Sequence, residues 1–179
     1  MQTDILAEQD LRPDTDAAIG ALLEGAFGCG AGYEGRSFHK MRHHLRVLGW
    51  QDGQLIGHVA LQLRAIRMGD APLTIVGVGV GEVATHPDHR GRGVASALMR
   101  QAISEATDSL AQFAVLFGYP GLYALLGFRS QPNRIRYLSW DGSGPGKVVT
   151  DTIDSLMVLP LGSREWDGAA EIDLCGPLF

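Results

Sequence analysis

The sequence is poor in features that would each point to a particular class of protein. It has two cysteines, Cys29 and Cys175, far apart and near no metal-ligand cluster, so the sequence predicts neither a disulfide framework nor a zinc site. It has no apolar run of about 18 residues, the length that a membrane-spanning helix needs. Its first residues lack the basic and apolar stretches of a secretory leader. We therefore expect a cytoplasmic protein with no membrane partner.

The chain also lacks an excess of basic residues. Its 15 Lys and Arg against 20 Asp and Glu give a net charge of −5, which argues against nucleic acid as a partner and favours cationic ligands such as amines. Its apolar content of 45% is ordinary for a globular protein, and the length of 179 residues suits one domain over residues 1–179. The 24 glycines exceed the usual share of about 7% and predict many turns and close backbone approaches.

The order of apolar and turn-forming residues predicts an α/β (α+β) chain. We expect strands over residues 3–7, 46–51, 54–66, 74–85, 112–117, 134–139 and 153–160, and helices that begin after Pro13, at Ser37, after the loop at 90–93 and near Gly121. Asp14 or Thr15 is expected to cap the first helix. The Asp52-Gly53 pair predicts a hairpin turn. The strand, helix and strand over residues 74–117 predict a right-handed unit with two parallel strands.

The most informative stretch is the loop that precedes the third of these helices. An apolar strand ends near Thr85, two arginines and two glycines follow, and an amphipathic helix begins at Val94. A helix N-terminus offers free N–H groups and the positive end of the dipole, glycines let the backbone approach an anion, and arginines add forked donors. The stretch Arg90–Ala95 differs from both a Walker loop and a Gly-x-Gly-x-x-Gly loop. A plain glycine-hinged loop is the alternative.

Three glycines share one face of the strand that leads into this loop. Gly77, Gly79 and Gly81 alternate with larger residues. Such a face marks a place where something approaches the backbone closely. A tightly packed helix is the alternative to a ligand groove, and we favour the groove.

Together these motifs resemble those of the GNAT superfamily of acyl-CoA-dependent N-acyltransferases. Arg90–Ala95 is similar to their pyrophosphate loop, Arg/Gln-x-x-Gly-x-Gly/Ala, and a Val-Ala-Thr-x-Pro strand end and a Tyr-x-x-x-Gly-Phe motif accompany it. The resemblance covers about residues 10–160. It implies a mixed central sheet of six to seven strands flanked by about four helices. It also implies acetyl-CoA or another acyl-CoA as cosubstrate, no metal, and a small-molecule amine as acceptor. The oligomeric state stays open, a homodimer included.

The same resemblance assigns roles to particular residues. The backbone N–H of Val83 would bind the acyl carbonyl, and backbone groups of Ala84 and Thr85 would hold the pantetheine arm. The pyrophosphate would lie on Arg90, Gly91, Arg92, Gly93, Val94 and Ala95. Tyr123 would be the general acid, because a phenol of reference pKa about 10 can protonate a leaving thiol of about 8.5. An ordinary packed tyrosine is the alternative.

The sequence departs from the family at the general base. The strand positions that commonly carry a glutamate are Gly79 and Gly81 here. Glu82 is adjacent, and it would point to the other face unless a bulge reverses the alternation. We keep both a base and a rim carboxylate as interpretations of Glu82. The asparagine often found before the tyrosine is also absent, and residues 117–120 read Phe-Gly-Tyr-Pro instead.

The acceptor site is predicted from a finer resemblance. The run from Glu34 through Ala95 and the tail Trp-x-x-x-x-x-Ile-Asp-x-x-Gly-Pro resemble nodulation N-acyltransferases, which acylate an amino sugar. The layout and the aromatic last residue resemble aminoglycoside 2′-N-acetyltransferases. This implies an acceptor held by Tyr33, Glu34 and the terminal carboxylate of Phe179, with a frayed terminus as the alternative. A non-catalytic acyl-CoA-binding domain and a protein or peptide acetyltransferase are the competing functions.

Three histidines, His39, His43 and His44, fall in the helix predicted from Ser37. His39 and His43 are four residues apart and could share a helical face, but no third ligand is near them in the sequence. We favour a solvated polar helix face over a metal site.

Overall fold

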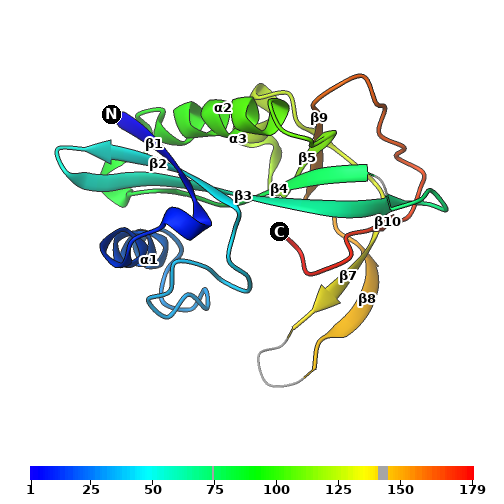
Figure 1. The fold of residues 1–179 in the computed structure, drawn as a ribbon, viewed down its shortest axis with the longest axis horizontal. Helices are drawn as coiled ribbons and strands as arrows, with labels where there is room; N and C mark the ends of the chain where they lie inside the picture. The colour runs from blue at the N-terminus through cyan, green and yellow to red at the C-terminus, as the bar shows by residue number, and fades with distance from the viewer. Residues whose placement is uncertain (74, 141–144) are drawn as a thin grey trace. The chain divides into compact units, whose positions relative to one another are not determined.

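The computed structural model describes residues 1–73, 75–140 and 145–179 (Figure 1). Its internal contacts divide the chain into two compact units. The first unit contains residues 1–62 and 80–105, and the second contains residues 63–79 and 106–179. Two long strands, β3 (Gln54–Met68) and β4 (Ile75–Thr85), contribute to both units. Thr74, with which the predicted fourth strand begins, lies outside the described residues.

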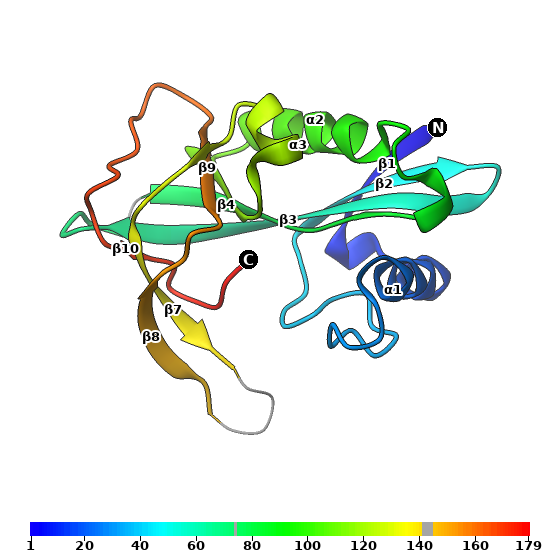
Figure 2. The ribbon, with the colours of Figure 1, turned by 180° about the vertical axis from the view of Figure 1, so that it is seen from behind.

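The first unit is an antiparallel arrangement of strands between two helices. β1 (Gln2–Ala7) pairs with β2 (Leu45–Gln51), and β2 pairs with β3 across the predicted hairpin. α1 (Pro13–Phe27) lies on one side of this hairpin and α2 (Val94–Thr107) on the other, as both ribbon views show (Figures 1 and 2). Two short 3₁₀ turns, Glu8–Asp10 and Pro87–His89, follow β1 and β4.

The start of α1 differs from the expectation. Its N-cap is Arg12, which makes no capping side-chain hydrogen bond, and Pro13 occupies the first helical turn. The predicted cap by Asp14 or Thr15 is therefore wrong. Proline needs no N–H acceptor at this position and its fixed φ suits a helix start, so the helix begins at Pro13, before either predicted cap.

The apolar face of α1 forms the core of the first unit. Its buried members are Ile19, Leu22, Leu23, Tyr33, Leu48, Leu55 and Ala84, drawn from α1, the following loop, β2, β3 and β4. The helical spacing that the sequence showed over residues 19–27 is thus the face that packs on the hairpin, with Phe27 itself left 45% exposed at the helix end.

The second unit is a mixed sheet. Its strand order is β6-β9-β5-β4-β3-β10-β7-β8, with β4 and β5 parallel and Gly77 opposite Phe113. The bounds of its remaining strands are β5 (Phe113–Phe117), β6 (Arg129–Ser130), β7 (Arg134–Ser139), β8 (Lys147–Thr152), β9 (Leu156–Pro160) and β10 (Ile172–Asp173). The short α3 (Pro120–Leu125) connects β5 to β6. The predicted parallel strand pair is confirmed.

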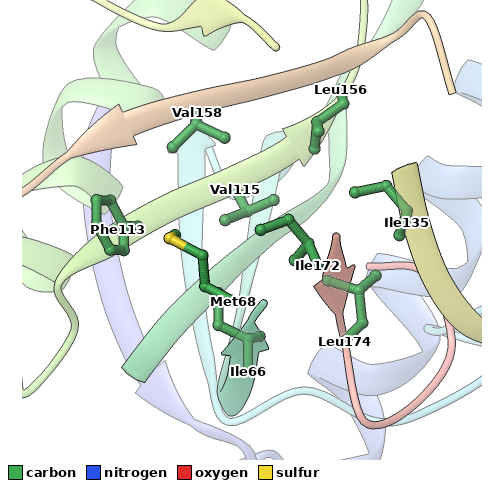
Figure 3. Packing of buried hydrophobic residues seen from close by; sticks show 9 residues of the cluster. All are labelled: Ile66, Met68, Phe113, Val115, Ile135, Leu156, Val158, Ile172 and Leu174. Carbon is green, nitrogen blue, oxygen red and sulfur yellow. The ribbon is translucent and has the colours of Figure 1, made fainter. Parts of the chain in front are cut away.

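Figure 3 shows the core of the second unit, where side chains from strands distant in sequence meet. Its members are Ile66, Met68, Phe113, Val115, Ile135, Leu156, Val158, Ile172 and Leu174. Trp166 packs edge-on against Phe113 with ring centroids 5.0 Å apart, and its indole N–H donates to Asn133 at 2.8 Å. The C-terminal tail is therefore part of this core, because Leu178 and Phe179 pack against the same cluster.

The element count corrects the expectation in two ways. The described ranges contain ten strands and three α-helices, against six to seven strands and about four helices expected. The additional strands are two-residue pairings, β6 and β10, and the mostly exposed β8, which carry little apolar periodicity. No α-helix of the described chain is long and apolar enough to cross a membrane.

The missing helix is the one predicted from Ser37, where residues 37–44 form an irregular loop instead. The Ser37 carbonyl accepts a hydrogen bond from Arg46 at 2.7 Å, and the His44 N–H donates to Leu61 at 2.9 Å. Side chains and neighbouring strands thus satisfy backbone groups that a helix would have paired internally. The interpretation of His39, His43 and His44 as a helix face is wrong for the same reason.

Candidate active site

The loop at the start of α2 has the backbone of an anion site. Gly91 and Gly93 adopt φ of 74° and 79°, a left-handed conformation that favours glycine, and residues 90–93 are exposed. α2 begins at Val94, and its first N–H groups have no intrahelical acceptor. Glycine turn, helix N-terminus and exposed arginines therefore coincide, as the sequence predicted.

Two glycines on neighbouring strands set how closely α2 approaches the hairpin. Gly49 and Gly57 lie opposite each other in the β2–β3 pairing. A Cβ on Gly57 would lie 2.6 Å from methyl carbons of both Val94 and Leu98. The absence of side chains at these two positions lets the first turns of α2 rest on the strands, and this contact fixes the loop in front of the helix.

Arg90 has a role in the fold that the sequence did not suggest. Its guanidinium donates to the carbonyl of Ala26 at 2.9 Å, at the C-terminal end of α1. A cation at this end also interacts favourably with the helix dipole. Arg90 therefore ties the loop to α1, while Arg92 is exposed on the loop.

We expect Gly93→Asp to weaken CoA binding by about tenfold or more (about 1.4 kcal/mol), because it places a carboxylate where phosphates are predicted to bind. Isothermal calorimetry measures the effect. Gly53→Asp is the matched control, since Gly53 has the same φ of 79° and equally open surroundings but lies in the hairpin turn. Gly93→Ala separates backbone strain from charge. Unchanged affinity in Gly93→Asp would place the anion site elsewhere.

Glu82 interrupts the regular alternation of β4. Its φ of 52° is left-handed, an irregularity inside the strand that redirects its side chain. The carboxylate is only 8% exposed. One oxygen accepts from the backbone N–H of His39 at 2.9 Å, and the other lies 2.8 Å from Nε2 of His43. Glu82 thus faces the loop that joins α1 to β2.

A buried polar cluster supports this strand irregularity. Arg46, with no exposed surface, donates to both oxygens of Glu8 at 2.7 and 3.0 Å. It also lies 3.1 Å from Nε2 of His58, whose Nδ1 is 2.8 Å from the carbonyl of Glu82. Because Arg46 can only donate, His58 must accept at Nε2 and donate from Nδ1. Burial, and then the charge of Arg46, lowers the pKa of His58 to about 3, so the ring is neutral.

The residues predicted to bind the acyl-pantetheine follow directly after Glu82. Val83 and Thr85 are half-buried, and Ala84 is buried in the core of the first unit. Val83, whose N–H is the predicted donor to the acyl carbonyl, therefore follows Glu82, a residue hydrogen-bonded through both its backbone carbonyl and its side chain.

Tyr123 lies in α3, in the second unit. Its ring packs against Gly118, where a Cβ would lie 2.5 Å from Cε2, and it meets Phe128 edge-on at 6.2 Å. Gly118, which belongs to the stretch that departs from the family, thus provides room for the tyrosine ring. Burial raises the pKa of Tyr123, so its phenol keeps its proton at neutral pH.

Tyr33 and Glu34, the predicted acceptor residues of the first unit, have different environments. Tyr33 is buried and stacks on Phe27 with ring centroids 5.6 Å apart. Burial, and then the charge of Glu82, raises the pKa of Tyr33. Glu34 is 78% exposed, has a left-handed φ of 52° and pairs with Arg36 at 3.7 Å.

The C-terminal residue is packed rather than frayed. The ring of Phe179 covers Gly79 of β4, and any Cβ at Gly79 would overlap it. The Arg64 guanidinium lies 4.3 Å from the ring centroid and donates to the carbonyl of Pro177. The glycine face of β4 therefore has an occupant within the second unit, namely the end of the chain.

Each unit brings together part of the predicted site. The first unit contains the loop 90–95, residues 83–85 and Glu82, and the second contains Tyr123 and Phe179. Sequence reasoning missed the buried cluster of Arg46 and His58. Their signal was a charged or polar residue inside an otherwise apolar strand pattern. No group of three metal-ligating side chains occurs in the described parts of the chain.

Comparison with known proteins identifies the family. Residues 11–130 match the acetyltransferase (GNAT) domain family. The chain is 31% identical over 143 residues to the uncharacterized N-acetyltransferase YhbS of Escherichia coli K12, an alignment that covers 70% of this chain and 74% of YhbS. The protein therefore belongs to the GNAT acetyltransferase family and is an N-acetyltransferase.

Solved structures share the fold. The crystal structure of E. coli YhbS in complex with CoA has a TM-score of 0.67 at 22% identity, covering 97% of this chain and 90% of that one. A GNAT family acetyltransferase from Brucella melitensis in complex with acetyl-CoA has a TM-score of 0.60 at 19% identity, covering 96% and 94%. The GNAT-like mixed α+β fold is thereby confirmed.

Proposed function

We propose that the protein transfers an acetyl group from acetyl-CoA to the primary amine of a small cationic acceptor. The observation that carries this proposal is the glycine loop 90–95 at the N-terminus of α2, in a chain of the acetyltransferase family. The CoA and acetyl-CoA complexes of the two structural relatives support the choice of cosubstrate. The pyrophosphate binds the loop, and the thioester carbonyl accepts from the N–H of Val83.

The chemistry uses few groups. The ammonium of the acceptor gives up a proton to a base, and the free amine attacks the thioester carbon to form the C–N bond. The C–S bond then breaks and its electron pair leaves with sulfur, which takes the phenolic proton of Tyr123. The surplus proton on nitrogen returns to Tyr123. The products are an amide, a thiol and one proton released to solvent.

An amino sugar is our leading acceptor class. The name of the relative YhbS gives no acceptor, so the choice of an amino sugar rests on residues of this chain. The net charge of −5 favours a cation, and Glu34 is exposed on the loop after α1, in the segment that also contacts Glu82. Phe179 is the proposed contact in the second unit, where Arg64 donates to the carbonyl of Pro177. An exposed carboxylate such as that of Glu34 attracts an ammonium group.

A thiol-release assay with acetyl-CoA and an amine panel tests the function. The panel contains amino sugars, alkylamines and a lysine-containing peptide. We expect turnover with a small amine and an amide product by mass spectrometry. CoA binding without turnover on any amine would indicate a non-catalytic acyl-CoA-binding domain, and turnover on the peptide alone would indicate a protein acetyltransferase.

Deleting Leu178 and Phe179 is expected to raise KM for the amine about tenfold and KM for acetyl-CoA less than about threefold, because the proposed contact at Phe179 is lost and the carboxylate of the shortened chain lies two residues away, on Pro177. Glu34→Gln should raise the amine KM by about two- to fivefold, as expected for an exposed charge. Steady-state kinetics on the best amine measures both effects.

Two controls accompany the acceptor variants. Glu165→Gln removes another exposed carboxylate and should leave KM unchanged. Phe179→Leu keeps the terminal carboxylate while removing the ring that packs on Gly79, so it isolates packing from charge. If both the deletion and Glu34→Gln leave amine kinetics unchanged, the acceptor binds elsewhere and the amino-sugar assignment fails.

A further inference from the structure

We propose that His43 is the general base of this acetyltransferase and that Glu82 orients it, so that the two residues act as one dyad. The proposal rests on the proposed acetyl transfer and names the proton acceptor of that same site. It replaces the simpler interpretation in which Glu82 itself takes the proton.

The geometry gives the two residues different tasks. Nε2 of His43 lies 2.8 Å from Oε2 of Glu82, and the side chains are 9% and 8% exposed. The two atoms are in close contact but do not form an aligned hydrogen bond. Such contacts commonly tighten when substrate binds. With Nε2 facing the carboxylate, the lone pair of His43 belongs to Nδ1.

Nδ1 of His43 is buried and has no hydrogen-bond partner among the described residues. An unpaired buried acceptor costs about 1–3 kcal/mol, and a water or an ammonium proton would remove this cost. The carboxylate of Glu82 is less available for the same task. Its Oε1 accepts from the N–H of His39, while Oε2, although it has no aligned hydrogen bond, lies 2.8 Å from Nε2 of His43 and 3.9 Å from Arg46. We therefore assign the proton to Nδ1, the buried and unpaired nitrogen on the other side of the ring.

The groups around the dyad do not compete for the proton. The charged and titratable neighbours are Glu8, Tyr33, His39, Arg42, Arg46 and His58. His58 is held neutral and already donates to the carbonyl of Glu82. Glu8 is occupied by Arg46 and Arg42, whose hydrogen bonds and charge outweigh burial and lower its pKa. Neither residue therefore takes the proton in place of His43.

The dyad lies next to the residue proposed to bind the thioester. Glu82 directly precedes Val83, whose N–H we assign to the thioester carbonyl. The irregular backbone at Glu82 turns its carboxylate toward the loop that joins α1 to β2. In the reaction, Nδ1 of His43 takes one proton from the acceptor ammonium, directly or through one water. The positive charge that forms on the ring is stabilised by Glu82. The proton leaves to solvent after the amide has formed.

The kinetic test compares His43→Gln, Glu82→Gln and the double variant with the wild-type enzyme on the best amine of the panel. We expect each single change to lower kcat by about 10²–10⁴-fold. The double variant should be no slower than the slower single variant, because residues that act as a unit are not additive. His44→Gln, the adjacent exposed histidine, is the matched control and should keep wild-type rates.

The pH dependence separates catalysis from a structural role. The amine's own titration cancels in the ratio of wild-type to His43→Gln rates. We expect this ratio to fall as the pH is lowered, because a base that already holds a proton cannot take one from the acceptor. A ratio that is independent of pH, or fully multiplicative losses in the double variant, would overturn the proposal.

The tautomer of His43 can be tested on the wild-type protein, so this test does not depend on whether a variant folds. Imidazole ¹⁵N shifts should show the neutral ring of His43 with a protonated Nε2 and a bare Nδ1, and the opposite tautomer would refute the dyad. Absence of turnover on every amine would instead contradict the proposed function. Wild-type turnover with unchanged kcat in His43→Gln would leave that function intact and reject His43 as the base. CoA calorimetry confirms that each variant is folded.

Discussion

Replacing Tyr123 with phenylalanine is expected to lower kcat by about 10²–10⁴-fold while CoA affinity changes little. The phenol is the proposed proton source for the leaving thiolate. Burial raises its pKa, so it is protonated when the thiolate forms. The substitution keeps the ring, which packs against Gly118 and Phe128. The loss should therefore appear in the chemical step, measured as kcat in the thiol-release assay, and not in stability or cofactor binding.

The control for this prediction lies four residues earlier. Tyr119 is 84% exposed, and Tyr119→Phe removes the same hydroxyl from the same segment, so its kcat should match that of the wild type. A Tyr123→Phe enzyme within about threefold of the wild type would remove Tyr123 from the mechanism, because threefold corresponds to well under 1 kcal/mol in the barrier.

Replacing Arg46 with methionine is expected to lower the free energy of unfolding by about 3–5 kcal/mol. Methionine fills much of the buried volume but donates no hydrogen bonds. It leaves the carboxylate of Glu8 without its charge partner and the Ser37 carbonyl without its donor. Urea unfolding at pH 7 measures the change. Arg42→Met, which breaks half-exposed ion pairs with Glu8 and Asp16, should cost about 1 kcal/mol or less.

Two further measurements locate the origin of this loss. Adding Glu8→Leu to Arg46→Met removes the orphaned charge and should restore part of the stability. The pKa of Glu8 is lowered in the folded protein, so its contribution is present above the unfolded-state pKa and is lost as the pH falls through the folded-state pKa. The wild type should therefore lose more stability than Arg46→Met on acidification. Equal acid sensitivity in both would show that the Glu8–Arg46 pair does not stabilise the fold.

The sequence by itself determined most of the elements and the glycine loop 90–95. Residues 19–27, the Asp52-Gly53 turn and the strand-loop-helix around Arg90–Ala95 each follow from local periodicity or from residues with special backbone freedom. The structure has α1, the hairpin and the start of α2 at these places. These features are predictable because they depend on neighbours within a few residues along the chain.

The packing of the tail was decided only by tertiary structure. The sequence predicted no strand in residues 172–179, yet β10 pairs with β3 and β7, and Phe179 covers Gly79, a hundred residues earlier in the chain. A glycine face on a strand indicates a close neighbour but cannot tell a ligand from a distant segment of the same chain. The contact between Phe179 and Gly79 shows that the neighbour is a distant segment of the same chain.

The surroundings of Glu82 were likewise decided by the fold. The alternation of β4 predicted its side chain on the face away from Gly79 and Gly81, and a left-handed residue reversed this locally. His43 lies beside Glu82 in a loop over residues 37–44, where the sequence predicted a helix, and the Ser37 carbonyl of that loop accepts from Arg46. Hydrophobic periodicity predicts a helix well when the backbone N–H and C=O groups of the segment pair with one another. Here the buried guanidinium of Arg46, on a strand, donates to a carbonyl of the segment. Such a hydrogen bond joins separate elements, so only the tertiary structure shows which side chains meet.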